Sequence, residues 1–127
     1  GKMERFRDQG EAMCSISDNL AAAGKHQEAA GWLERARKIA EAHGFFSVEC
    51  ASCLGLGKMA MLEGRLEEGV ELLRNAMAAA PLSEGNQNHL ELQVLQYFTM
   101  ALFDTDAFGE AEPLVPRYRK AKRGAHR

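Results

Sequence analysis

The chain has 127 residues, of which 46% are hydrophobic and 27% are charged, and its formal net charge is −2. This length predicts a single domain with a modest core. The balanced charge gives no reason to expect a nucleic acid or an anionic membrane as a partner, and no apolar run approaches the ~18–20 residues that span a bilayer.

Six helices are predicted, because helix-forming residues dominate and apolar residues recur three and four positions apart. In the second helix, for example, Ala29, Leu33 and Ala36 form one apolar stripe, and Gly44 is its expected stop. The fold class is therefore all-α. The breaks between helices are predicted at residues 23–25, at 44–47 with Ser47 as the cap of the third helix, at 63–65, at 81–88 and at 104–106.

The stretch "GLGKMAMLEG", residues 55–64, resembles a phosphate-binding loop only superficially. Such a loop needs a glycine five residues before the Gly-Lys pair, a Ser or Thr after it, and a preceding strand. Here Ser52 and Met59 occupy these positions and no strand is predicted. We interpret Gly57 as a packing residue that allows two helices to approach closely.

The chain repeats itself. "GKHQEAAGWLERARKIA" from Gly24 and "GRLEEGVELLRNAMAAAP" from Gly64 share the same order of glycine, basic, acidic, small and leucine positions, about 40 residues apart. A weaker third copy, "DAFGEAEPLVPRYRK", follows after about 42 more residues. Repeats of this length built as helix, turn, helix are typical of helical solenoids.

These positions resemble the tetratricopeptide repeat family, in the long-repeat form of kinesin light chains and spindle-orientation scaffolds. The resemblance implies a right-handed superhelical solenoid of three helix-turn-helix repeats, over about residues 4–44, 47–81 and 88–123, in a single domain spanning residues 1–127. The matching positions are Ile16-Ser17, Gly24, Ala29, Leu33 and Ala36 in the first repeat, Leu56-Gly57, Gly64, Gly69, Leu73, Ala76 and Pro81 in the second, and Phe98-Thr99, Phe108, Ala111 and Val115 in the third.

Cysteine usage argues against a secreted disulfide framework, because Cys14, Cys50 and Cys53 are too few and too unevenly spaced. A reducing, cytoplasmic compartment is therefore expected. Cys50 and Cys53 form a CxxC pattern, which lowers a thiol pKa when it lies at a helix N-terminus. Without a second such pair or suitably spaced histidines, we interpret both as small buried residues and expect no metal and no cofactor.

The C-terminal stretch "RYRKAKRGAHR" carries six Lys and Arg residues and no acidic residue. We expect residues 124–127 to form a basic tail and the stretch to be frayed and solvated, with a basic patch for an acidic partner as the alternative.

The resemblance implies a concave groove lined by the first helix of each repeat, where partners of this family bind as peptides or helices. No nucleophile with its base and orienting group can be assembled, so the chain is expected not to be an enzyme. It is expected to bind a protein or peptide, and the alternative is a self-associating structural segment or a fragment of a larger scaffold. The residues expected to line the groove are Glu11, Cys14, Asp18, Ala21, Leu54, Lys58, Met61, Gln93, Gln96, Met100 and Phe103.

Overall fold

A computed structural model describes residues 1–82 and 88–125. These residues form α-helices, one short 3-10 helix and their connections, without a strand. The all-α prediction is confirmed. In chain order the elements are α1 (Lys2–Ala22), α2 (His26–His43), α3 (Phe46–Leu62), α4 (Leu66–Ala79), η1 (Ala80–Leu82), α5 (Asn88–Asp104), α6 (Phe108–Ala111) and α7 (Leu114–Ala125).

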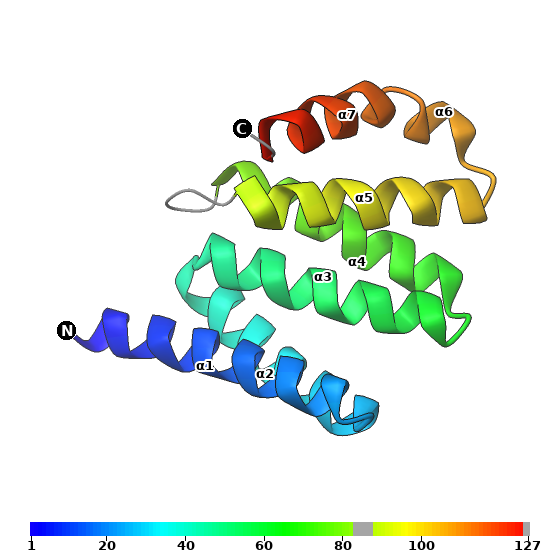
Figure 1. The fold of residues 1–127 in the computed structure, drawn as a ribbon. Helices are drawn as coiled ribbons and strands as arrows, with labels where there is room; N and C mark the ends of the chain where they lie inside the picture. Colours follow the sequence, from blue (N-terminus) through cyan, green and yellow to red (C-terminus); the bar gives the residue numbers. More distant parts are fainter. Residues whose placement is uncertain (83–87, 126–127) are drawn as a thin grey trace.

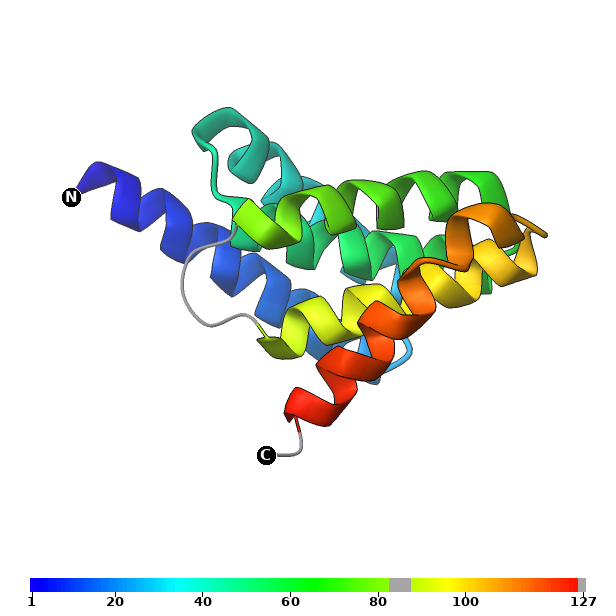
Figure 2. The same ribbon diagram turned by 90° about the horizontal axis from the view of Figure 1, so that it is seen from above.

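The helices lie in three layers: α1 with α2, α3 with α4, and α5 with α6 and α7 (Figure 1). Each helix packs on its neighbours in the chain, and α3 also touches α1 and α5. Helices α1, α3 and α5 therefore share one side of the stack, and α2 and α4 lie behind them. Seen from above, α5 lies between α4 and α7 (Figure 2).

Three of the turns have the same geometry. Gly24 and Gly64 both have a φ of 80°, and Asp106 takes the corresponding place in the third turn with a φ of 61°. A left-handed residue at this place ends the helix and lets a backbone N–H beyond it reach back to a carbonyl of the last turn. These hydrogen bonds run from Lys25 to Leu20 at 2.8 Å, from Arg65 to Ala60 at 2.9 Å and from Ala107 to Leu102 at 2.8 Å.

Paired helices cross at the small residues that the repeat alignment singles out. At the first crossing, the buried Ser17 hydroxyl on α1 donates a 2.8 Å hydrogen bond to the carbonyl oxygen of Ala29 on α2. At the second, Gly57 on α3 faces Gly69 on α4, and a Cβ built on either glycine would lie 3.3–3.4 Å from the other's carbonyl oxygen. Ala111 is buried at the third.

The prediction that Ser47 caps the third helix is wrong. Helix α3 already begins at Phe46, so Ser47 lies inside its first turn, and no side chain caps the helix. Gly44, with a φ of 73°, and Phe45 make the whole connection. Phe45 is buried with Val48 in a cluster against α2, and this burial places the start of the helix.

The sixth predicted helix is divided into α6 and α7 around Pro113. A proline inside a helix removes an N–H group and clashes with the preceding turn, so the chain stops at Ala111 and starts again at Leu114. Pro116 then falls in the first turn of α7, where a missing N–H costs little. After this break Leu114 is buried, whereas Val115, the residue that the repeat alignment matches to Leu33 and Leu73, is only half-buried.

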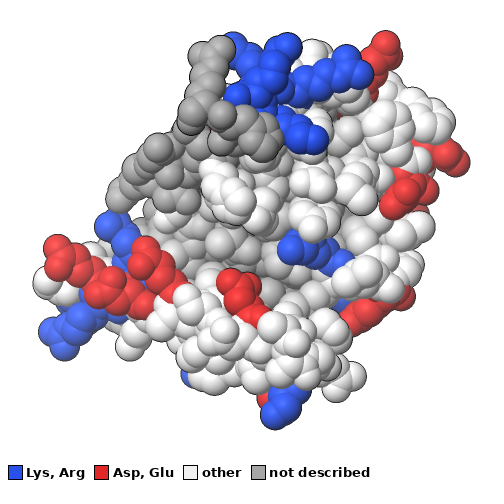
Figure 3. Space-filling view, viewed as in Figure 1, with Lys and Arg blue, Asp and Glu red and all other residues white. Residues whose placement is uncertain are grey.

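The basic C-terminal stretch is helical up to Ala125, which corrects the expectation of a frayed tail; residues 126–127 lie outside the described part. Leu114, Tyr118 and Ala121 pack into the core against the elements beneath α7. The basic side chains remain exposed and gather over this helix, as Figure 3 shows at the top of the molecule. They are Arg117, Arg119, Lys120, Lys122 and Arg123.

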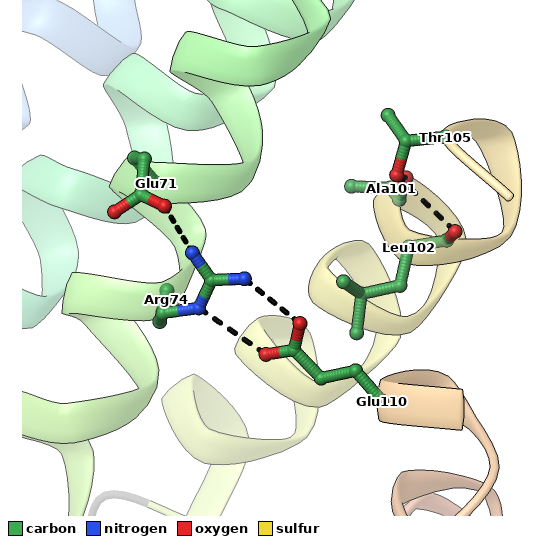
Figure 4. A network of polar contacts seen from close by, with 6 residues as sticks. All are labelled: Glu71, Arg74, Ala101, Leu102, Thr105 and Glu110. Atoms are coloured by element: carbon green, nitrogen blue, oxygen red, sulfur yellow. Dashed lines mark hydrogen bonds and ion pairs between the residues drawn. The ribbon is translucent and has the colours of Figure 1, made fainter. Parts of the chain in front are cut away.

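An ion pair joins the last layer to the one below it. The Arg74 guanidinium on α4 donates two hydrogen bonds to the Glu110 carboxylate on α6, at 2.8 and 3.2 Å, and also contacts Glu71 (Figure 4). The bond to Glu110 is the largest cause of the raised pKa of Arg74. A bidentate arrangement of this kind fixes the relative orientation of its two helices.

We predict that Gly57→Ala destabilises the protein by about 1–3 kcal/mol, because the added Cβ would lie 2.8 Å from Cγ of the fully buried Leu73. Gly31→Ala is the matched control, since a Cβ at this helical glycine meets nothing within 4 Å. This change should stabilise the chain by about 0.5–1 kcal/mol. Urea denaturation followed by circular dichroism measures both. A stabilised Gly57→Ala variant would contradict the close crossing.

Candidate functional site

A pocket of about 310 Å³ opens between α3 and α5, on the side of the stack that these helices share with α1. Its wall is mostly apolar, and Leu62 at its rim is 83% exposed. Figure 3 shows this side of the molecule, where uncharged surface fills most of the middle. The pocket is lined by Lys58, Met61, Leu62, Leu73, Tyr97, Met100, Ala101 and Asp104.

Two charged side chains border this apolar wall. The Lys58 ammonium lies 4.7 Å from the centre of the Tyr97 ring, a cation–π contact that joins α3 to α5. Asp104 is exposed at the last residue of α5. The pocket therefore offers an apolar interior with one cation and one anion at its margin.

The back of this pocket is formed by the crossing of α3 and α4. Leu73 lies over Gly57, and Met61 lies over Gly69, with its Sδ 2.6 Å from the place a Cβ would take. Both side chains line the pocket. The glycines thus allow Met61 and Leu73 to lie flat against the neighbouring helix.

A second, more open pocket of about 330 Å³ lies beside α3, between α1 and α5. Glu11 and Cys14 of α1 line it together with residues from the start of α3 and with Leu90 of α5. Cys14 is half-buried, and burial, with Asp18 and Glu11 nearby, raises the pKa of its thiol to about 11.

Several of the predicted groove residues come together. Lys58, Met61 and Met100 line the first pocket, and Glu11 and Cys14 line the second. The prediction of Leu54 is wrong: this residue is only 4% exposed and belongs to the core that α3 forms with α4 and α5.

The remaining predicted side chains line neither pocket. Asp18 and Gln96 are exposed, Ala21 is half-buried, and Gln93 bonds His89 of its own helix at 3.0 Å. Phe103 turns toward Phe108 of α6, with 5.8 Å between the ring centres.

Five residues that line the first pocket were not among the predicted groove residues: Leu62, Leu73, Tyr97, Ala101 and Asp104. Leu62 follows Lys58 by four positions, and Asp104 follows Met100 by four, so each continues the face of a predicted residue. Helical spacing could have found them. It does not decide between the stripe through Gln96 and Phe103 and the adjacent stripe through Tyr97 and Asp104.

The CxxC cysteines are packing residues. Cys50 and Cys53 are fully buried in the core, and burial raises the pKa of their thiols to about 12 and about 11. Cys50 also lies in the second turn of α3, beyond the reach of the helix N-terminus. The structure thus contradicts the alternative of a reactive thiol with a lowered pKa.

In residues 1–82 and 88–125, no three His, Cys, Asp or Glu side chains are grouped so that they could hold a metal ion. Over the same residues, none of the helices has both the length and the apolar character needed to cross a membrane. Comparison of the chain with protein-family models, with curated proteins and with solved structures gives no match.

We predict that the Cys50 and Cys53 thiols react slowly with a disulfide reagent at about pH 8 and rapidly once urea unfolds the chain, because burial shields them and keeps them protonated. Since the folded-state pKa of Cys50 lies above its ordinary value of 9.0, its contribution to stability is complete below about pH 9 and is lost as pH rises toward 12. Cys50→Ala should weaken this alkaline loss. Fast labelling of Cys50 or Cys53 in the folded chain would contradict the burial.

Proposed function

We propose that the chain is a non-enzymatic binding module that takes an amphipathic helix or peptide of a partner protein against α3 and α5. The pocket of about 310 Å³ carries this proposal, because it combines an apolar interior with a highly exposed Leu62 at its rim. Apolar pockets with a few polar groups at the margin are the usual form of a ligand site. Flexible methionines suit the packing of a helix in such a groove.

The proposal includes a tetratricopeptide-like solenoid. Three turns of equal geometry and helix crossings at aligned small residues support repeated helix pairs. In such a stack the first helices of the pairs line the binding surface, which agrees with the position of both pockets beside α3 and α5. The chain would act as an adaptor or scaffold.

Met100→Glu tests the proposal, because Met100 lines the pocket and is already 51% exposed, so that the fold should tolerate the change. The probes are helical peptides selected from a random display library on the 127-residue chain. We expect Met100→Glu to weaken their binding at least about tenfold in fluorescence anisotropy, since it places a carboxylate against the apolar wall.

Met3→Glu is the matched control. Met3 is also 51% exposed but lies on α1 and does not line the pocket. Binding by this variant should equal that of the wild type, and both variants should keep the wild-type helical signal. Selected peptides that bind Met100→Glu as well as they bind the wild type would refute the proposed site.

Self-association is the second candidate. Exposed apolar side chains gather at the ends of α3 and α5 and at the start of α6, and a second copy could cover them. These side chains are Leu62, Met100, Phe103 and Phe108.

Light scattering behind a sizing column separates the two candidates. The binding-module proposal predicts a mass of 14.0 kDa across a wide concentration range. A mass of two chains that returns to one chain in Leu62→Glu would instead make self-association the function of this surface. Leu62 is exposed enough for this substitution to leave the fold intact.

A further inference from the structure

The charges around the pocket lie at its two ends. Helices α3 and α5 run in the same direction (Figure 1), so positions along them can be compared. Lys58 contacts Tyr97, which places both at one level of the pocket. Asp104 follows Tyr97 by seven residues on α5, which is roughly 10 Å along the helix axis.

Lys58 and Asp104 are both without a charged partner among the described residues, since no ion pair joins either of them to another side chain there. Lys58 still has N–H donors that its contact with the Tyr97 ring leaves unused. The apolar Met61 and Met100 lie on the wall between the two ends.

We infer that this pocket is electrostatically polar and sets the direction of its ligand: a helix that inserts a bulky apolar side chain, with a carboxylate facing Lys58 and a Lys or Arg facing Asp104. This inference rests on the proposed function and adds to it the chemistry of the partner. A separation of roughly 10 Å corresponds to about two turns of the partner helix. The two charges would therefore stand about seven residues apart, on either side of the apolar residue and on the same face.

Three synthetic helical peptides of about 15 residues test the inference. Each has a central leucine in an Ala/Gln background; the first carries Glu before the leucine and Lys after it, the second Glu at both places and the third Lys at both. We expect the wild-type chain to bind the Glu/Lys peptide about two- to fivefold more tightly than either of the others, as one exposed ion pair provides. The preference should fall in high salt.

Charge reversal on the protein should redirect this preference. Asp104→Lys should favour the Glu/Glu peptide, and Lys58→Glu should favour the Lys/Lys peptide. The double variant Lys58→Glu/Asp104→Lys should prefer the Glu/Lys peptide again, but bound in the opposite direction. A spin label on the peptide N-terminus reports the direction, since it should broaden NMR signals near Lys58 in the wild type and near Leu62 in the double variant.

Lys58→Gln and Asp104→Asn keep the test decisive if a reversed variant fails to fold, because each should remove about half of the discrimination. Equal binding of the three peptides by the wild type, or an unchanged preference in every variant, would overturn the polarity and leave the groove proposal standing. Absence of binding by all three peptides to the wild type would count against both.

Discussion

The close crossing of α3 and α4 at Gly57 and Gly69 is the constraint on which the rest of the structure depends. Without side chains at these positions the two backbones approach closely, and Leu73 and Met61 fold over the gap from opposite helices. Overpacking at such a site has few ways to relax, because protein interiors are as dense as organic crystals. The same two side chains form the back of the pocket, so the surface that we propose for binding is a product of the crossing.

Much of the fold could be predicted because turns and helix crossings each need particular residue types. A left-handed Gly24, Gly44, Gly64 or Asp106 marks the turns after α1, α2, α3 and α5, and small residues at repeat spacing mark the crossings, so these helices and pairs follow from local sequence. The end of the last helix pair does not follow from local sequence. Pro113 and Pro116 predict that the helix is interrupted, but whether the chain bends or breaks there depends on the burial of Leu114 against the core.

The candidate site was harder to predict because α3 is buried on most of its circumference. Val48, Cys50, Cys53, Leu54 and Leu56 are all buried, so no single polar stripe marks the side that faces solvent. Leu54 was therefore assigned to the surface although it belongs to the core. On α5 the stripes through Gln96 and Tyr97 are adjacent in sequence pattern, and it is the contacts in the folded chain, above all the cation–π contact with Lys58, that show Tyr97 facing α3.

The pocket lies between two layers, with α3 on one side and α5 on the other. In a stack where each layer touches only its neighbours, the attachment of an end layer is a separate free energy from the stability of the middle one. Arg74 and Glu110 supply part of that attachment for the last layer, from the back. Within the last layer, the buried Thr99 hydroxyl on α5 has no hydrogen-bond partner among the described residues, which is a cost to the stability of that layer. A ligand that bridges α3 and α5 would act as an added interlayer contact, so its binding free energy and the docking of the last layer become one linked quantity.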